Sequence, residues 1–227
     1  MAQAHQTAAV LISGGLDSAV LLGDMLRQYA SVQPLYVAMG LAWEAVERTH
    51  LQRFLAEIAC PQLQPLHVLH LPVADLYDHG HWSLSGQEVP DAASADEAVY
   101  LPGRNVLLLA KAVIWCQLHR VPVVALGVLK GNPFPDATPD FFKGYQKIVN
   151  QGIGGDVRVI RPFAVTSKRE VMLLGRALPL HLTFSCIRPV AGEHCGRCNK
   201  CAERQRAFAD AAMNDATTYA AEGPCTA

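Results

Sequence analysis

The hexapeptide SGGLDS at residues 13–18 places small residues and side-chain oxygens between two apolar runs. Gly14 and Gly15 let the backbone approach an anion closely and take dihedral angles that are closed to other residues. An apolar stretch with helical spacing follows, and the free N–H groups and dipole at the start of a helix favour phosphate. Asp17 would repel phosphate, so we expect it to cap the helix or to hold Mg²⁺. The hexapeptide therefore predicts a phosphate-binding loop.

Other glycine patterns bear on this prediction. A Walker A sequence, G-x-x-x-x-G-K-[ST], occurs nowhere in the chain, so the loop is of a different kind. A plain Gly-Gly turn with an aspartate cap is the alternative, and the position of the whole hexapeptide between an apolar strand and an apolar helix favours phosphate binding over it. The segment GIGGD at residues 152–156 is interpreted as a turn between a helix and a strand.

Four cysteines form a second candidate site: Cys186, Cys195, Cys198 and Cys201. The Cys-x₂-Cys spacing lets two thiolates reach one ion, and four sulfur ligands suit tetrahedral Zn²⁺ in a closed structural site. The same ligands can hold an iron–sulfur cluster, so both stay open at this point. His194 could replace one thiolate, although four cysteines make it unnecessary. We expect one structural Zn²⁺ per chain.

The remaining cysteines carry no such pattern. Cys60 and Cys116 are interpreted as core thiols, and Cys225 lies in a chain end, residues 217–227, that we expect to fray.

The composition predicts a globular protein with a small-molecule substrate. Of the 227 residues 51% are hydrophobic and 17% are charged, and the formal net charge is −1. Such a charge gives no general attraction to nucleic acid or to an anionic membrane. No apolar stretch approaches the length of a membrane span, and no basic segment precedes a long apolar run at the N-terminus. We therefore expect a cytoplasmic protein with no membrane and no nucleic-acid partner.

Apolar runs and helical patterns alternate along the chain, and these elements must position the two motifs. Repeated β–α units of this kind predict an open parallel five-stranded sheet with helices on both faces, a Rossmann-like α/β fold. Ligands bind at the carboxyl ends of such strands, which is where the hexapeptide lies. The predicted strands are residues 8–12, 32–39, 66–71, 121–128 and 157–163, and the predicted helices are residues 17–29, 43–59, 105–118, 166–178 and 202–213.

Between residues 72 and 104 the periodicity disappears, and histidines, serines, glycines and carboxylates dominate. A segment of this length inside a domain is usually functional or mobile. Its His79 and His81 are a candidate metal pair, but a mobile, solvated loop is the favoured interpretation.

Several motifs resemble known families. The Ser-Gly-Gly-x-Asp-Ser loop resembles the PP-loop of ATP pyrophosphatases, which grip the pyrophosphate end of ATP and cleave between the α and β phosphates. The sequence TFSC…HCGRCNKCAERQRAF resembles the 7-cyano-7-deazaguanine synthase family (QueC or ExsB) in spacing and flanking residues. YLPGRNVLLLAKAVIWC and PFAVTSKREVMLLG are similar to further segments of that family, in the same order. The resemblance implies a fold of the adenine nucleotide alpha hydrolase type with a small C-terminal zinc-binding helical segment.

The resemblance also implies site residues. Lys168, at a helix start, would neutralise charge together with Mg²⁺ as pyrophosphate leaves. Arg104 would pair with phosphate or carboxylate through its planar fork. With Asp17, these two are the candidate catalytic residues. The expected ATP-binding residues are Ile12, Ser13, Gly14, Gly15, Leu16, Asp17, Ser18, Ala19, Gly103, Arg104, Asn105 and Gly127, and the expected substrate-binding residues are Asn132 and Asp136.

Two stretches depart from the family pattern. Leu129 stands where the family has asparagine, and Ala137 and Thr138 stand where it has Cys-Arg. After the second strand, GLAWEAVE replaces an aromatic-Gly-Gln segment. Both stretches are expected to touch the substrate, and a polar group left unpaired costs about 1–3 kcal/mol. We therefore expect ordinary ATP binding, with weaker binding of the family's acceptor or with a related acceptor in its place.

The function implied by the resemblance is an ATP-dependent carbon–nitrogen ligase. It would convert 7-carboxy-7-deazaguanine and free ammonia to 7-cyano-7-deazaguanine through adenylated intermediates, releasing AMP and pyrophosphate. Two alternatives stay open: a PP-loop ligase with another carboxylate acceptor, and a zinc-ribbon protein that binds nucleic acid. We expect a homodimer, with a PP-loop domain at residues 1–180, a zinc-binding segment packed on it at residues 181–215, and a tail at residues 216–227.

Overall fold

Five parallel strands form the centre of the molecule, for which a computed structural model describes residues 6–221. The strands lie in the order β3-β2-β1-β4-β5, so the first strand of the chain is paired on both sides. Val10, for example, lies opposite Pro34 of one neighbour and Ala125 of the other. The strand bounds are β1 Thr7–Leu11, β2 Ser31–Ala38, β3 His67–His70, β4 Val123–Ala125 and β5 Arg158–Ile160.

Helices fill the connections between the strands and follow the last strand, and three of them begin with a side-chain cap. Ser167 and Glu170 form a reciprocal capping box at the start of α6, and the Thr138 hydroxyl accepts a hydrogen bond from the Phe141 amide at the start of α5. The helix bounds are α1 Leu16–Gln28, α2 Glu44–Glu57, α3 Trp82–Ser85, α4 Arg104–Leu118, α5 Pro139–Ile153, α6 Lys168–Leu174 and α7 Asn199–Asp210. Short 3₁₀ segments are η2 Asp96–Val99, η3 Pro135–Ala137 and η4 Leu180–Leu182.

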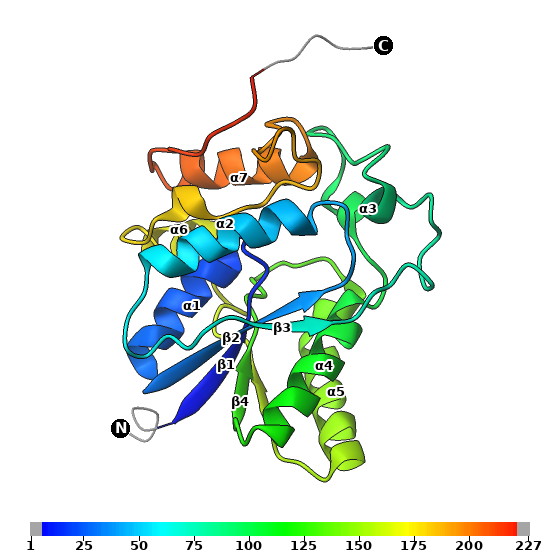
Figure 1. Ribbon diagram of the computed structural model, residues 1–227, viewed down its shortest axis with the longest axis vertical. Helices are drawn as coiled ribbons and strands as arrows, with labels where there is room; N and C mark the ends of the chain where they lie inside the picture. Colours follow the sequence, from blue (N-terminus) through cyan, green and yellow to red (C-terminus); the bar gives the residue numbers. More distant parts are fainter. Residues whose placement is uncertain (1–5, 222–227) are drawn as a thin grey trace.

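Apolar side chains on both faces of the sheet explain why helices cover both sides (Figure 1). Ala8 and Val10 of β1 belong to a buried cluster with side chains of α1, α2, α6 and α7. Ala9 and Leu11 belong to a second buried cluster with side chains of α4 and α5. Burial of successive residues is typical of a parallel strand between two helix layers. The predicted α/β fold with an open five-stranded parallel sheet is confirmed.

The strand order places a topological switch point beside β1. From β1 the chain proceeds to β2 and β3 on one side of the sheet, and then returns to form β4 and β5 on the other side. In open α/β sheets ligands bind at such a point, outside the carboxyl ends of the strands. The loops after β1 and β4 are therefore the natural place for a site.

Some predicted elements differ from the observed ones. α5 was not among the predicted helices; it is a surface helix in which only Phe142 is buried. β4 and β5 end at Ala125 and Ile160, earlier than predicted, because the chain leaves the sheet for loops. α7 begins at Asn199, before the predicted start. The predicted turn at residues 152–156 is confirmed, with Gly154 ending α5 at φ 60°.

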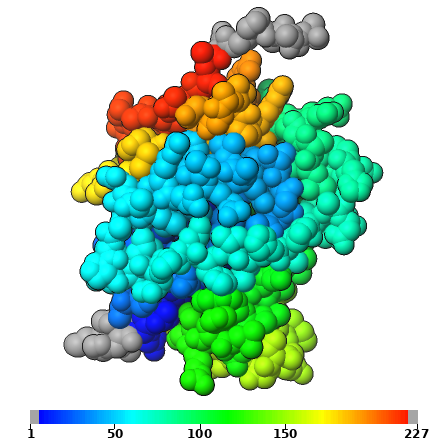
Figure 2. Space-filling model, viewed as in Figure 1, coloured from blue at the N-terminus to red at the C-terminus, as the bar shows by residue number. Residues whose placement is uncertain are grey.

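Residues 72–103 pack against the rest of the molecule and form its teal flank (Figure 2). The backbone amide of Asn199 donates to the Pro90 carbonyl at 2.9 Å, and its side-chain amide donates to the Ser94 carbonyl at 2.9 Å. Trp82 stacks on Trp43, with ring centroids 5.7 Å apart. These contacts anchor the segment at Trp82, Pro90 and Ser94, while His79 is exposed, so the interpretation of the region around His79 as a mobile, solvated loop stays a prediction.

The described part of the chain end is also held in place. Thr217 is buried and accepts a hydrogen bond from Arg204, and the Ala220 amide donates to the His194 carbonyl at 2.8 Å. The expected fraying is therefore wrong for residues 217–220, while Cys225 lies outside the described residues. Among residues 6–221, none of the helices has the length and apolar character needed to cross a membrane.

Candidate active site

The loop between β1 and α1 is shaped by glycine and closed by serine hydroxyls. Gly14 adopts φ 79°, a conformation that favours glycine, and Gly15 is the N-cap of α1. The Ser18 hydroxyl donates to the Gly15 carbonyl at 3.1 Å and accepts from the Ser13 amide at 3.2 Å. The start of α1 therefore opens toward the carboxyl end of the sheet, as anion binding requires.

The loop after β4 lies directly against this turn. A Cβ atom added to Gly127 would lie 3.2 Å from the backbone carbon and oxygen of Asp17 and 3.3 Å from the Ser18 nitrogen. Only a residue without a side chain leaves this close approach undisturbed. Gly127 thus brings the carboxyl ends of β1 and β4 together at the switch point.

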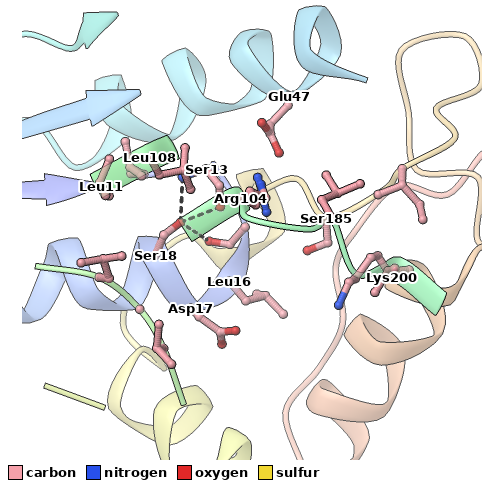
Figure 3. A pocket seen from close by; sticks show the side chains of 18 of the residues that line it. Leu11, Ser13, Leu16, Asp17, Ser18, Glu47, Arg104, Leu108, Ser185 and Lys200 are labelled. Carbon is pink, nitrogen blue, oxygen red and sulfur yellow. Dashed lines mark hydrogen bonds between the residues drawn. The ribbon is translucent and has the colours of Figure 1, made fainter. Parts of the chain in front are cut away.

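A cavity of about 310 Å³ opens above these two loops. Its volume falls in the range of small-molecule sites. Side chains from α1, α2, α4, α6 and α7 all reach it, and Figure 3 shows Asp17, Glu47, Arg104, Ser185 and Lys200 around the shared space. The cavity is therefore built jointly by the sheet, its helices and the C-terminal segment.

A chain of four charged side chains crosses one side of the cavity. The Lys168 Nζ atom lies 2.8 and 2.9 Å from the two carboxylate oxygens of Asp17, and 3.1 Å from Glu203 Oε1. Lys200 Nζ lies 2.7 Å from the other oxygen of Glu203. Burial alone would raise the pKa of Glu203, but the two ammonium groups outweigh it and hold that pKa at about 2. Asp17 and Glu203 therefore each form an ion pair with a lysine.

Glu47, a buried acidic side chain, lies at the other side of the cavity. Glu47 is 7% exposed, and its Oε2 atom accepts a hydrogen bond of 2.6 Å from the Tyr36 hydroxyl. Burial raises its pKa to about 8, although the Tyr36 hydrogen bond and the positive charge of Arg104 act to lower it. Glu47 is thus predominantly protonated at neutral pH, when it can donate as well as accept.

Arg104, the first residue of α4, is the candidate anion-binding group between these two sides. Its Nε atom is buried and has no hydrogen-bond partner within residues 6–221. A guanidinium group in this state is suited to a carboxylate or phosphate, which it binds through its planar fork. Arg104 therefore offers a donor to a bound anion.

The remaining wall combines aromatic rings with polar groups. Trp43, Tyr100 and Phe134 line the cavity, and the last two stack with ring centroids 4.9 Å apart. Asp136 is 6% exposed, and its Oδ2 atom accepts a hydrogen bond of 2.9 Å from the Asn105 amide. Aromatic faces beside a fixed carboxylate suit a flat heterocycle with hydrogen-bond donors.

The structure brings most of the predicted site residues together around this cavity. Three predicted ATP-binding residues do not line it: Gly14 packs toward Glu47, Ala19 is fully buried in the core, and Gly103 is the left-handed N-cap of α4. Those that line it are Ile12, Ser13, Gly15, Leu16, Asp17, Ser18, Arg104, Asn105, Gly127, Asn132, Asp136 and Lys168.

The residues that depart from the family pattern after β4 do not face the cavity. Leu129 packs against the core beneath α1 and α6, Ala137 is buried in the opposite core, and Thr138 caps α5. Leu126, Gly127 and Val128 line the cavity, but the chain turns away after them, so these three replacements have no direct contact with it. The expected loss of acceptor affinity stays a prediction.

Several lining residues were not identified from the sequence. The pairing of Glu47 with Tyr36 arises only in the folded chain, although Glu47 belongs to the stretch GLAWEAVE that was expected to touch the substrate. Lys200 and Glu203 appear in the sequence as part of a mixed charged helix, and their role depends on the packing of α7 beside α6. The spacing of the cysteines was the available signal for Lys200 and Glu203, because it determines where α7 begins.

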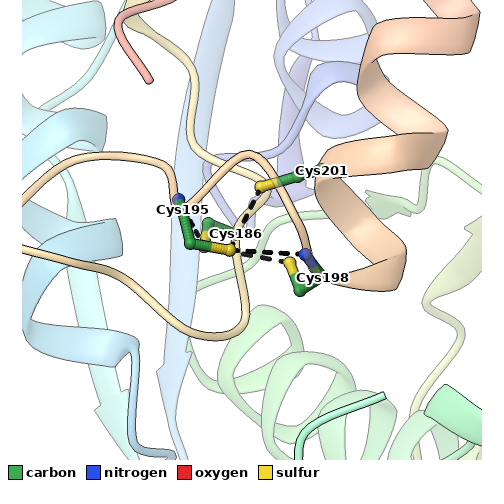
Figure 4. Close-up of side chains that lie close together, drawn as sticks. All are labelled: Cys186, Cys195, Cys198 and Cys201. Carbon is green, nitrogen blue, oxygen red and sulfur yellow. Dashed lines mark hydrogen bonds between the residues drawn. The ribbon is translucent and has the colours of Figure 1, made fainter. Parts of the chain in front are cut away.

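The four cysteines form a buried cluster at the start of α7 (Figure 4). Their sulfur atoms all lie within 4.8 Å of one another, with Sγ of Cys195 and Cys201 3.9 Å apart and Sγ of Cys186 and Cys198 3.9 Å apart. A tetrahedral ion with metal–sulfur bonds of about 2.3 Å places its ligands about 3.8 Å apart. These residues therefore fit a metal ion such as zinc.

Backbone donors and neighbouring histidines complete the surroundings of this cluster. The amides of Arg188 and Cys195 each donate to Cys186 Sγ at 3.3 Å, which favours the thiolate form. His194 accepts a hydrogen bond from the Ser185 amide through Nε2, so this atom is occupied away from the sulfurs. His81 caps α3 through Nδ1, and His79 is exposed; neither belongs to the one group of three or more possible metal ligands within residues 6–221.

Known proteins of one family match this chain. A family model described as "Queuosine biosynthesis protein QueC" covers residues 7–212. The chain belongs to the QueC family. Curated relatives named 7-cyano-7-deazaguanine synthase include those of Leptospira interrogans (27% identity, 93% of this chain and 90% of the relative), Rhizobium etli (32%, 92% and 90%) and Acidobacterium capsulatum (31%, 97% and 99%). As a member of the QueC family, the chain is an ATP-dependent enzyme.

Proposed function

We propose that this QueC-family enzyme converts 7-carboxy-7-deazaguanine and ammonia to 7-cyano-7-deazaguanine, with two ATP molecules cleaved to AMP and pyrophosphate. The observation that carries the proposal is the single cavity that joins the glycine loop to Lys168 and Arg104. The names of the curated relatives support the acceptor. The aromatic wall with Asp136 supports a flat, hydrogen-bonding heterocycle.

The phosphate end of ATP is proposed to occupy the start of α1. Gly15 and the following amides supply N–H donors there, and Ser13 and Ser18 supply hydroxyl groups. Lys168, which pairs with Asp17 in the described structure, exchanges this partner for a phosphate oxygen and neutralises the charge that grows on pyrophosphate. Mg²⁺ held at Asp17 would supply further charge neutralisation on the phosphates.

Arg104 is proposed to hold the acceptor carboxylate against the α-phosphate. The carboxylate oxygen attacks the α-phosphorus, the bond to the β-phosphate breaks, and pyrophosphate leaves. Ammonia then attacks the acyl carbon, AMP leaves, and an amide forms after loss of a proton. The amide oxygen attacks a second ATP in the same way, pyrophosphate leaves, and departure of AMP with loss of the two protons of the amide nitrogen yields the nitrile. The Nε atom of Arg104, which has no hydrogen-bond partner within residues 6–221, suits an anionic first substrate.

The four-cysteine cluster is proposed to hold one structural Zn²⁺ per chain. The two sulfur–sulfur distances of 3.9 Å support a single tetrahedral ion. In an iron–sulfur cluster the cysteines are shared among several irons, which separates the sulfurs further. Elemental analysis of anaerobically purified protein is expected to give one zinc and no iron per chain, and stoichiometric iron would contradict the assignment.

We also propose that the protein is cytoplasmic, that it forms a homodimer, and that the PP-loop domain ends near residue 180. An apolar surface on α4 and α5 supports association, since Leu118 is 74% exposed and Ile148 is 61% exposed. Sedimentation analysis tests the dimer.

The proposed reaction is tested by mass spectrometry of the acceptor after incubation with ATP, Mg²⁺, ammonia and 7-carboxy-7-deazaguanine. The expected products are the amide at early times and the nitrile at late times, with neither formed by Lys168→Ala. An unchanged acceptor alongside ATP cleavage with another carboxylate would overturn the substrate assignment.

A further inference from the structure

We propose that Lys200, which lies between two cysteines of the metal-binding cluster, is a second phosphate-binding lysine of the ATP site. The inference rests on the proposed ATP cleavage and adds a group that the C-terminal segment delivers to it. Lys200 is the second residue of α7, and its side chain reaches the cavity that Asp17 also lines (Figure 3). Lys168 lines the same cavity.

Local energetics do not account for a lysine at this position. The first turn of a helix carries a partial positive charge, which disfavours a cation there, and the first turn of α7 has no acidic residue. The pair with Glu203 at 2.7 Å has the i, i+3 spacing that contributes little in partly exposed positions. An anion in the cavity supplies the favourable partner that the helix itself lacks.

The charge pattern around Lys200 suits exchange with an incoming phosphate. Glu203 binds Lys200 through Oε2 and Lys168 through Oε1, and Lys168 also binds Asp17. Two lysines and two carboxylates thus balance one another in the described structure. When a polyphosphate binds, its oxygens replace the carboxylates as partners of both ammonium groups. Before it binds, Glu203 holds the two lysines close together.

The metal-binding cluster determines where Lys200 lies. Cys198 is the N-cap of α7, and Cys201 lies in its first turn, so the two cysteines flank Lys200 on both sides. A metal ion held by these sulfurs fixes the first turn of the helix and hence the direction of the lysine. The structural site is thereby coupled to phosphate binding.

The test compares Lys200→Met with Lys147→Met, which removes an exposed lysine on α5. Calorimetric titration with inorganic pyrophosphate and Mg²⁺ is expected to show about tenfold weaker binding for Lys200→Met, the loss of one charge-assisted contact. Lys147→Met is expected to match the unaltered protein, and Lys200→Arg to retain most of the affinity. Zinc content and melting temperature, measured in the same samples, show whether α7 is intact.

The outcomes separate this inference from the proposed function. Equal pyrophosphate affinity in Lys200→Met and the unaltered protein would overturn the role of Lys200 and leave ATP cleavage standing. A failure of the unaltered protein to bind either pyrophosphate or ATP would overturn both. In addition, chelation of the metal is expected to weaken pyrophosphate binding in the unaltered protein but to add little in Lys200→Met. Equal losses in both proteins would contradict the coupling through Lys200.

Discussion

Replacement of Glu47 by glutamine should remove a pH dependence of stability that the structure assigns to this buried acid. Burial raises the pKa of Glu47 from 4.5 to about 8. Between these two values the unfolded chain has lost the proton while the folded chain retains it. The free energy of unfolding contributed by Glu47 is therefore fully present below pH 4.5, falls as pH rises, and becomes constant above about pH 8.

The size of the effect follows from the shift. Each pH unit within the window lowers the free energy of unfolding by up to about 1.4 kcal/mol, because the folded and unfolded states differ by one bound proton. Between pH 5.5 and pH 7.5 the upper bound is about 2.7 kcal/mol. For a domain of this size, about 1 kcal/mol corresponds to roughly 2–4 °C in melting temperature. Glutamine keeps an acceptor for the Tyr36 hydroxyl, which lies 2.6 Å from Oε2, and has no proton to lose.

Thermal unfolding of Glu47→Gln and unaltered protein, measured in parallel from pH 5.5 to pH 7.5, tests this reasoning. We expect the melting temperature of the variant to rise relative to that of the unaltered protein as pH increases, by several degrees over the range. Glu57→Gln, which removes an exposed acid from the same helix, is the matched control and should run parallel to the unaltered protein. A constant difference between Glu47→Gln and the unaltered protein at every pH would refute the protonated state of Glu47.

Three further predictions concern the loops and the cluster. Gly127→Ala should raise the KM for ATP about tenfold, because a Cβ at 3.2 Å from the Asp17 backbone separates the two loops at a cost of about 1–3 kcal/mol. The control is Gly144→Ala, whose added Cβ meets nothing within 4 Å and should leave the KM unchanged. Lys168→Ala should lower AMP formation at least about 100-fold, because it removes the ammonium group expected to neutralise the charge on the departing pyrophosphate; retained turnover would exclude this role. Cys198→Ala should lose the metal and destabilise the fold by more than about 3 kcal/mol, and an intact melting temperature with lost activity would contradict a structural site.

The parts of the site that lie close together in the sequence were predictable from it. Residues 13–18 carry their own glycine and helix-start signals, and the strand before them has the continuous apolar character of a buried parallel strand. Cysteine spacing similarly predicted the four-sulfur cluster, because residues three positions apart at the start of a helix can share one ion. In both cases the local chain determines the geometry.

The parts that depend on packing between distant elements were not predictable. The Asp17–Lys168 pair joins residues 151 positions apart, and Lys168 meets Glu203 only because α7 packs beside α6. The pKa of Glu47 depends on its burial against the glycine loop, which a sequence does not reveal. Leu129 was assigned to the substrate by position alone, and a single step along the loop, from Val128 to Leu129, changes the side chain from the cavity to the core.

We propose that the cavity at the switch point cleaves ATP between the α and β phosphates to activate a carboxylate. Phosphorus NMR of a complete reaction with ATP, ammonia and 7-carboxy-7-deazaguanine measures this most directly. We expect two AMP and two pyrophosphate for each nitrile formed, with no cleavage when the acceptor is omitted. Release of ADP and orthophosphate as the main products would contradict it.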